Sequence, residues 1–333
     1  MTRIKKVVIT AYGDESKLAI VECDLPEPAA GEVQLVVEYT IVSGSDVNMR
    51  RGTYPFQKKP PLTPGYSVLG KVCVNGKGCS KFKIGERVAC LSKYEGQAER
   101  INLPEKYLVP VPDGVDGRAA VALILDWATA YQLLHRAAHV TAGQKIFVHA
   151  LSGAVGGALL RLGLLQGTQV FGTASLKRHD ELRQLGAVPF DYATKHWIAA
   201  MQEQGGVDAV FDPLGYESFD ESYSILNKSG ILVGYGTNLP TWTGTPARPV
   251  IPTVLKLFSK NLLFWSGKRT TFFGVSRGSK YFATDLEQLF QWLKDGKISV
   301  PIKATFKLDE IQQAHREYAR GARMGSIVIE VGR

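Results

Sequence analysis

The chain has 333 residues, of which 45% are hydrophobic and 21% charged, and its formal net charge is +9. The length accommodates two hydrophobic cores, and the composition is that of an ordinary globular protein without an apolar run long enough to cross a bilayer. The basic residues lie in small scattered groups, which argues against nucleic acid as a partner, and the first ten residues lack the apolar core of a secretory signal. We therefore expect a cytoplasmic protein that binds neither nucleic acid nor membrane.

The first third of the chain alternates short strand-like runs with glycine- and proline-containing turns. β-Branched residues in such runs predict a compact all-β unit. The runs cover residues 7–11, 19–23, 33–41, 68–74, 87–91 and 98–103.

From about residue 113, helical and strand-like segments alternate. Helices are predicted at 118–138, 156–165, 178–185, 196–203, 219–226 and 253–258, and strands at 145–149, 168–173, 188–192, 207–212, 231–235 and 262–265. This alternation predicts a doubly wound parallel sheet of the Rossmann type, covered by helices on both faces. The segment 238–252, rich in Pro, Thr and Gly, is expected to be a surface loop.

The last part of the chain mixes helices at 284–294 and 309–320 with strands at 303–306 and 326–331. The apolar last strand needs a sheet to join, and we expect it to return to the N-terminal unit. The predicted fold is therefore α/β with two domains. A Rossmann domain spans 121–266, and a β-rich catalytic domain combines 1–120 with 267–333.

The most informative motif is His149-Ala-Leu-Ser-Gly-Ala-Val-Gly156, which lies between a predicted strand and a predicted helix. This is the context that a dinucleotide fingerprint requires. Backbone amides of Ser152, Gly153, Ala154 and Val155 would bind phosphates at the helix N-terminus. Because the first glycine of the strict pattern is replaced by Leu151, an ordinary tight turn between strand and helix is the alternative.

The end of the second Rossmann strand distinguishes the two nicotinamide cofactors. An NAD site usually has Asp or Glu there, whereas this chain has Gly172-Thr-Ala-Ser-Leu-Lys-Arg178. Hydroxyls at Thr173 and Ser175 and cations at Lys177 and Arg178 suit a 2′-phosphate. The pattern favours NADPH, and the alternative is a helix start with exposed basic residues.

Several motifs along nearly the whole chain resemble the zinc-free, quinone oxidoreductase-like branch of the medium-chain dehydrogenase/reductase superfamily. They are Pro26-Glu-Pro-Ala-Ala-Gly-Glu-Val33, Arg51-Gly-Thr-Tyr-Pro55, Thr63-Pro-Gly65, Phe82-Lys-Ile-Gly-Glu-Arg-Val88, Ala128-Thr-Ala-Tyr131, the phosphate turn and Leu185-Gly-Ala187. The resemblance implies a chaperonin-10-like catalytic domain. It also implies an active site between the domains.

The resemblance further implies that zinc is absent. Zinc-dependent members have a Cys where this chain has Ser45, and Gly-His-Glu where it has Gly65-Tyr-Ser67. A hydroxyl and a phenol do not replace thiolate and imidazole in a tetrahedral zinc site. We therefore expect no metal.

The family pattern also implies further cofactor contacts. Ser43 and Thr129 would lie near the nicotinamide, Tyr192 near the 2′-phosphate, Phe273 over the nicotinamide ring and Arg323 near the phosphates. The nicotinamide ribose would lie beside Gly234, Tyr235 and Gly236. Quinone oxidoreductases commonly have Asn where this chain has Ser43, so both the nicotinamide contact and the substrate contact differ here.

Without a metal, hydride transfer needs an activated acceptor and a hydrogen-bond donor at the oxygen on which charge develops. Tyr54 is the first candidate, as donor or proton source, followed by Tyr66 and Ser43; the alternative is that the tyrosines only pack. The predicted function is an NADPH-dependent quinone or α,β-unsaturated carbonyl reductase. A pathway-specific enoyl reductase and a weakly catalytic NADPH-binding sensor are the alternatives. We expect a homodimer formed through an apolar sheet edge near Leu232 and Tyr235.

Overall fold

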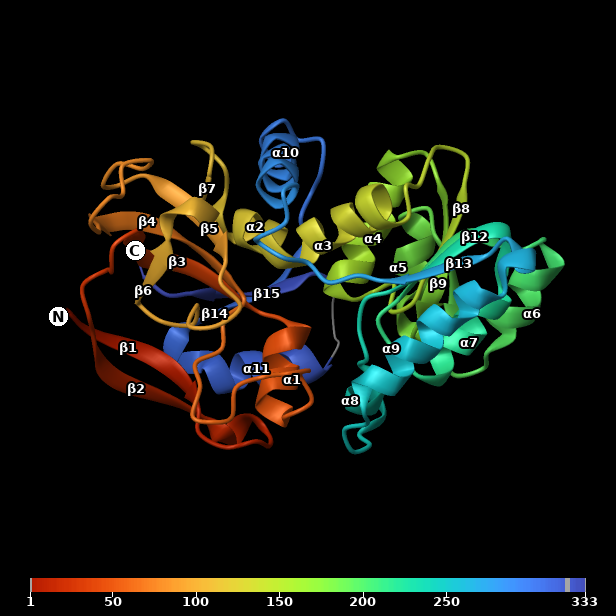
Figure 1. The fold of residues 1–333 in the computed structure, drawn as a ribbon, viewed down its shortest axis with the longest axis horizontal. Coiled ribbons are helices and arrows are strands. Elements are labelled where there is room, and N and C mark those ends of the chain that lie inside the picture. The colour runs from red at the N-terminus through yellow and green to blue at the C-terminus, as the bar shows by residue number, and fades with distance from the viewer. Residues whose placement is uncertain (1, 321–323, 333) are drawn as a thin grey trace. The chain divides into compact units, whose positions relative to one another are not determined.

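The computed structural model, described for residues 2–320 and 324–332, has two compact units (Figure 1). The first, called here the β-rich unit, holds the chain up to Ala128 and the part from Val275 on; the second, the α/β unit, is Thr129–Gly274. Within the described ranges, none of the helices has the length and apolarity to span a membrane. Each unit is described by itself below.

The β-rich unit contains a seven-stranded sheet of order β14-β15-β3-β4-β5-β7, with β6 pairing to β3, and a separate β1-β2 pair. Its strands are β1 Thr2–Ile9, β2 Leu18–Leu25, β3 Glu32–Val42, β4 Ser67–Asn75, β5 Arg87–Leu91, β6 Arg100–Pro104, β7 Val109–Pro110, β14 Ile302–Lys307 and β15 Ser326–Glu330. β15 pairs antiparallel with β3, which confirms that the last strand returns to the N-terminal unit.

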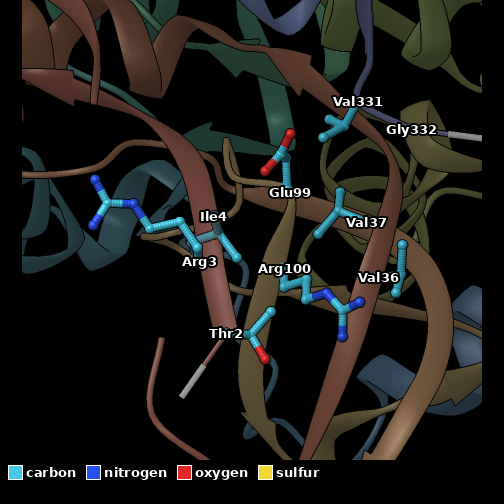
Figure 2. Close-up of a pocket in the computed structure, with 9 residues that line it drawn as sticks. All are labelled: Thr2, Arg3, Ile4, Val36, Val37, Glu99, Arg100, Val331 and Gly332. Carbon is cyan, nitrogen blue, oxygen red and sulfur yellow. The ribbon is translucent and has the colours of Figure 1, made fainter. Parts of the chain in front are cut away.

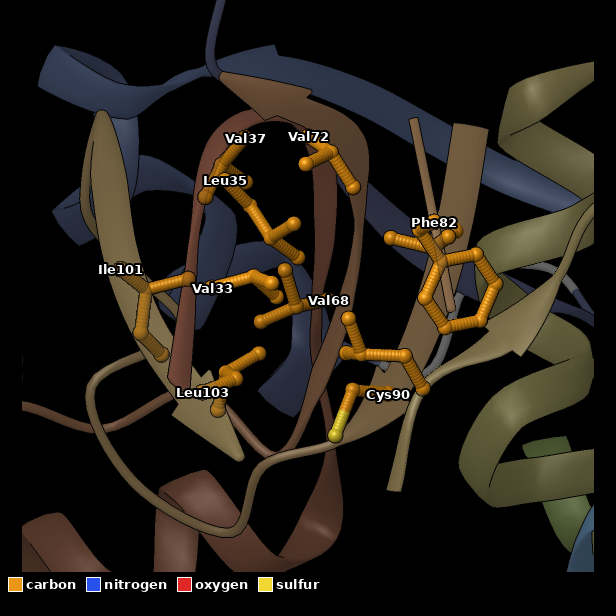
Figure 3. Packing of buried hydrophobic residues seen from close by; sticks show 11 residues of the cluster. Val33, Leu35, Val37, Val68, Val72, Phe82, Cys90, Ile101 and Leu103 are labelled. Carbon is orange, nitrogen blue, oxygen red and sulfur yellow. The ribbon is translucent and has the colours of Figure 1, made fainter. Parts of the chain in front are cut away.

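Alternate side chains of β3 and its neighbours form the core of this sheet. Val33, Leu35 and Val37 of β3 pack with Val68 of β4, Ile101 of β6 and further apolar residues (Figure 3). The alternation arises because successive strand residues point to opposite faces. The six strands predicted here are therefore confirmed. The core consists of the apolar side chains that recur at every second residue of these strands.

Four helices accompany this sheet: α1 Gly44–Arg51, α2 Gly117–Ala122, α10 Phe282–Lys294 and α11 Ile311–Arg320. Single 3₁₀ turns are η1 Glu15–Lys17, η2 Glu105–Tyr107 and η8 Leu308–Glu310. Helix α1 was not predicted, because its eight residues contain only two apolar side chains, Val47 and Met49, which do not make a helical period. Its signals are its termini: Ser43 and Asp46 form a capping box, and Gly52 ends the helix at φ 75°.

The α/β unit has a six-stranded sheet in which every pair of neighbours is parallel, in the order β10-β9-β8-β11-β12-β13. The strands are β8 Lys145–Val148, β9 Gln169–Ala174, β10 Val188–Asp191, β11 Val207–Asp212, β12 Leu226–Gly234 and β13 Arg269–Phe272. The helices are α4 Ala154–Leu165, η5 Leu176–Arg178, α5 His179–Gln184, α6 His196–Glu203, α7 Glu217–Ser224, α8 Leu239–Thr243 and α9 Val250–Ser259. The doubly wound parallel sheet is thus confirmed.

The helix predicted at 118–138 is a succession of helical segments. After α2 it continues through a π-helical stretch, η3 Leu123–Trp127, then α3 Ala128–Gln132 and a second π-helical stretch, η4 Leu133–Ala137. The succession crosses from the β-rich unit into the α/β unit at Thr129.

Three predictions in the α/β unit are wrong in detail. Residues 262–265 form no strand: two 3₁₀ turns, η6 Lys260–Leu262 and η7 Phe264–Ser266, stand there, and the sixth strand is β13. The Asn261 side chain donates to the Thr270 carbonyl and accepts from the Thr270 amide, and these two bonds link η6 to β13. The expected loop 238–252 contains α8 and the start of α9. Finally, β12 is internal and Leu232 fully buried, so the predicted edge near Leu232 and Tyr235 is not an edge.

Candidate functional site

The turn after β8 presents backbone amides at the start of α4. Gly153 caps the helix and no side chain bonds the first-turn amides. The turn is closed by the Gly153 amide, which donates to the carbonyl of Ala150 at 2.8 Å, and Ala150 has the left-handed φ of 59°. A Cβ on Gly156 would lie 2.1 Å from the same carbonyl oxygen, so only glycine fits there. This geometry is that of an anion site at a helix N-terminus.

The predicted phosphate ligands lie together at this helix start. Ser152, Gly153, Ala154 and Val155 are all half-buried, between the fully buried Leu151 and the buried Gly156. Their backbone is therefore accessible while the residues on either side anchor the turn in the core.

The end of β9 carries cations and no carboxylate. Arg178 pairs with Glu181 at 3.0 Å, whereas Lys177 is exposed and forms no ion pair within the described part of the chain. Ser175 precedes the 3₁₀ turn η5, and its side chain does not cap that turn. Tyr192, 63% exposed, follows β10, the neighbouring strand. Of the two cations, Lys177 is thus the one without an ion-pair partner among the described residues.

Two glycines predicted beside the nicotinamide ribose are required by packing. A Cβ on Gly234 would lie 2.6 Å from the Phe219 ring, and one on Gly236 would lie 2.5 Å from the Pro213 carbonyl oxygen. The amide of Phe273 donates to the carbonyl of Gly234, and that of Tyr235 donates to the carbonyl of Asp212. The predicted residues are therefore joined at the carboxyl ends of β11, β12 and β13, where ligands of doubly wound folds bind.

Thr129 and Arg323 are two further residues that were predicted to contact the cofactor. The hydroxyl oxygen of Thr129 is buried and has no hydrogen-bond partner within the described residues. An unpaired buried hydroxyl is costly, so this atom is available to a polar ligand. Arg323 lies outside the described residues.

In the β-rich unit, Ser43 is bound to the fully buried Asp46. Its amide and its hydroxyl donate to one carboxylate oxygen of Asp46 at 2.9 and 2.6 Å, and the amide of Gly65 donates to the other at 2.9 Å. Burial raises the pKa of Asp46, against these hydrogen bonds, which lower it. Since the Ser43 proton is engaged, the arrangement argues against Ser43 as a donor to a substrate oxygen.

Tyr54 and Tyr66 form a hydroxyl pair. Their oxygens are 2.9 Å apart, and their rings meet edge to face with centroids 6.2 Å apart. One hydroxyl donates to the other, so the pair retains one proton for a ligand. Burial raises the pKa of both phenols; the Tyr66 hydroxyl further raises the pKa of Tyr54, whereas the hydrogen bond with Tyr54 lowers that of Tyr66. The raised pKa values keep both hydroxyls protonated at neutral pH, so the pair can donate a hydrogen bond there.

A cation borders the tyrosine pair. The Lys93 ammonium lies 5.7 Å from the centroid of the Tyr54 ring and 5.6 Å from that of Tyr94. Negative charge that develops on an oxygen near the Tyr54 hydroxyl would be stabilised by this ammonium. Sequence reasoning missed Lys93, whose only local signal is its neighbour Tyr94.

One hollow of the β-rich unit lies away from these residues. It measures about 300 Å³ and lies beside β1, β3 and the end of the chain, with Arg3, Glu99 and Arg100 on its wall (Figure 2). None of the predicted site residues lines it. Among the described residues, His, Cys, Asp and Glu side chains form no group of three that could hold a metal.

Comparison with known proteins places this architecture. A model of the alcohol dehydrogenase GroES-like domain matches residues 29–117, and a model of zinc-binding dehydrogenases matches residues 185–329. The synaptic vesicle membrane protein VAT-1 homolog of Rattus norvegicus is 28% identical over 343 residues, covering 99% of this chain and 84% of the relative. A probable quinone oxidoreductase of Schizosaccharomyces pombe is 27% identical over 327 residues, covering 97% and 96%.

Solved structures agree with these relatives. A mycobacterial protein complexed with NADPH has a TM-score of 0.84 and 26% identity, and the match covers 98% of this chain and 99% of that one. A GroES-like β unit joined to a doubly wound α/β unit defines an oxidoreductase of the alcohol dehydrogenase type. The chain belongs to the medium-chain dehydrogenase/reductase superfamily, and the predicted resemblance is confirmed at that level.

Proposed function

We propose that the chain binds NADPH at the carboxyl ends of the α/β strands and reduces a quinone or an α,β-unsaturated carbonyl compound without zinc. The observation that carries this proposal is the combination of a helix start at Gly153 that has no side-chain cap with a strand end at Ser175 and Lys177 that has no carboxylate. The unpaired Thr129 hydroxyl fits the same cofactor. In this proposal the α/β unit is the cofactor domain and the β-rich unit the catalytic domain.

The chain's own groups then have distinct tasks. Amides at the start of α4 bind the pyrophosphate, and Lys177 with Ser175 binds the 2′-phosphate. Bound NADPH supplies the hydride. The hydroxyl pair of Tyr54 and Tyr66 donates a hydrogen bond to the acceptor oxygen as negative charge develops there. In this proposal solvent water supplies the proton that completes the reduction, and both phenols, whose pKa values are raised, remain protonated.

The absence of zinc is proposed from the residues at the family's ligand positions. Ser45, Tyr66 and Ser67 offer two hydroxyls and a phenol, and the phenol is already bonded to Tyr54. These groups are not the thiolate and imidazole ligands that zinc prefers. Activity should therefore survive exhaustive dialysis against a chelator.

The activity is tested by following the absorbance of NADPH with a panel of quinones, enones and saturated ketones. We expect oxidation of NADPH with conjugated acceptors and none with saturated ketones, since only the former are activated without a Lewis acid. If no compound of the panel oxidises NADPH, the proposed reaction is overturned. Loss of activity after chelation, with recovery on added zinc, would overturn the metal-free mechanism.

A second function is favoured by one observation. The Ser43 hydroxyl is engaged by Asp46, at a position where quinone oxidoreductases commonly have Asn. An NADPH-binding protein with little catalysis would tolerate that engagement, and it would bind NADPH tightly without turnover. A pathway-specific enoyl reductase would instead turn over one bulky enone and no simple quinone.

We also propose a homodimer, formed through the edge that the structure has rather than the one first predicted. β13 is one of the two edge strands of the sheet, and the turns before it expose Leu262, Phe264 and Trp265 at 73, 82 and 72%. An unpaired strand edge beside exposed apolar side chains invites a second copy. Light scattering should give twice the chain mass, and Trp265→Glu should reduce it to the monomer.

A cytoplasmic location remains part of the proposal. The four cysteines are unpaired, which fits a reducing compartment. Because relatives include proteins named for vesicle membranes, fractionation of cells is the appropriate test, and recovery with membranes would contradict this location.

A further inference from the structure

A buried histidine stands at the end of the first strand of the α/β unit, directly before the phosphate turn. His149 is 2% exposed, and its ring lies 5.2 Å from that of Phe147 and 5.0 Å from that of Trp197. Within this apolar enclosure, both ring nitrogens have partners. Nδ1 lies 3.1 Å from the Thr173 hydroxyl, and Nε2 lies 3.0 Å from the Ser222 hydroxyl.

The direction of each hydrogen bond follows from the carboxylate at the far end. One oxygen of the fully buried Asp212 accepts from the hydroxyls of Ser218 and Ser222, both at 2.7 Å. Since Ser222 gives its proton to Asp212, its oxygen accepts from His149, and Nε2 must carry the ring proton. Nδ1 is then a bare acceptor, and Thr173 donates to it.

The same chain of hydrogen bonds ends at the turn of residues 149–156, called here the phosphate turn. With its proton on His149, the Thr173 oxygen accepts from the amide of Ala150 at 3.4 Å. Ala150 is the residue whose left-handed backbone shapes the turn, and its carbonyl accepts from Gly153. At the other end, the second oxygen of Asp212 accepts the amides of Leu214 and Gly215 after β11. One chain of hydrogen bonds, each with an assigned direction, thus joins the turns after β8 and β11.

We infer that His149, as a neutral ring protonated on Nε2, is a positioning residue that sets the phosphate turn through Thr173. The role requires one donor and one acceptor on a single rigid ring, which only histidine offers. Burial lowers the pKa of His149, in keeping with a neutral ring, although Asp212 and Glu221 act in the opposite direction. The inference concerns the site of the proposed function and rests on it for its effect on NADPH binding.

The first test is independent of NADPH. Nitrogen NMR of the ¹⁵N-histidine-labelled chain at neutral pH reports which ring nitrogen carries the proton. We expect the Nε2–H form in the native chain. In Asp212→Asn an amide replaces the accepting oxygen, so Ser222 must turn its proton toward the ring, and the signature should move to Nδ1–H. A ring protonated on Nδ1, or on both nitrogens, in the native chain would overturn the inference.

The second test measures the consequence. His149→Phe and Thr173→Val should each weaken NADPH binding about tenfold, the loss expected for one hydrogen bond that positions a turn. The double variant should lose no more than either single variant, because the two residues act in series. Rescue by His149→Gln, which keeps one donor and one acceptor, is expected in part. The matched control is Ser224→Ala, whose hydroxyl, among the described residues, bonds only the Glu221 carbonyl on the same helix.

The outcomes separate the two proposals. If the native chain binds no NADPH, the proposed function fails, while the NMR signature still decides the proton position. If the native chain binds NADPH and the His149 and Thr173 variants bind it equally well, the positioning role is refuted. Losses that add in the double variant would refute the series arrangement.

Discussion

Replacement of Lys177 by alanine removes a cation at the end of β9 that has no ion-pair partner among the described residues. Lys177 is exposed and unpaired among the described residues, while its neighbour Arg178 is held by Glu181. A hydrogen bond to a charged group contributes about 1.5–3 kcal/mol, and exposure to solvent reduces this to about 1–2 kcal/mol. NADPH should therefore bind about 5- to 30-fold more weakly to Lys177→Ala, since 1.4 kcal/mol is a factor of ten.

The cofactor without the extra phosphate provides the internal comparison. NADH affinity should be unchanged in Lys177→Ala, because no group of that cofactor faces this cation. Fluorescence titration of both cofactors at two salt concentrations measures this, and the NADPH difference should shrink as salt screens the pair. Arg183→Ala, on the following helix and already paired with Asp180, is the control. Equal losses for both cofactors, or no loss for either, would refute the reasoning.

Two further variants test the catalytic and the folding parts of the model. Tyr54→Phe should lower kcat roughly tenfold and leave NADPH affinity unchanged, because Tyr66 retains a hydroxyl proton; an unchanged kcat in steady-state assays would exclude the pair from catalysis. The buried Asp126 carboxyl, bonded by Ser326, has its pKa raised by desolvation from 3.8 to about 6. Its contribution to stability is complete below pH 3.8 and is lost as pH rises through 6, a loss of roughly 3 kcal/mol. Asp126→Asn should therefore be more stable than the native chain in urea at pH 7.5 and equally stable near pH 4; a variant less stable at both would contradict this.

Strand periods and turn residues predicted the parallel sheet because its strands are buried on both faces and therefore apolar throughout. The same rule misplaced the last strand: Leu262, Leu263, Phe264 and Trp265 are the more apolar run, yet they face outward, while the polar Arg269–Phe272 pairs with β12. Local periodicity does not distinguish an apolar run that is exposed at the surface from one that forms a buried strand.

The candidate site divides along a similar line. Residues in one turn, such as Ser152 and Gly153, could be predicted because the chemistry of a helix start is local. The hydrogen bonds between Ser43 and Asp46 have a local signal in the sequence, the three-residue spacing of a capping box. The Tyr54–Tyr66 pair and the chain through His149 join residues 12 to 73 positions apart, and only the tertiary fold brings them together.

The central claim is that the turn at Gly153 and the strand end at Lys177 bind an adenine dinucleotide with a 2′-phosphate. Its most direct test is calorimetric titration of the intact chain with NADPH and with NADH in the same buffer. We expect NADPH to bind at least about tenfold more tightly, the value of one charge-assisted contact. Equal affinity, a preference for NADH, or no binding of either cofactor would contradict the claim.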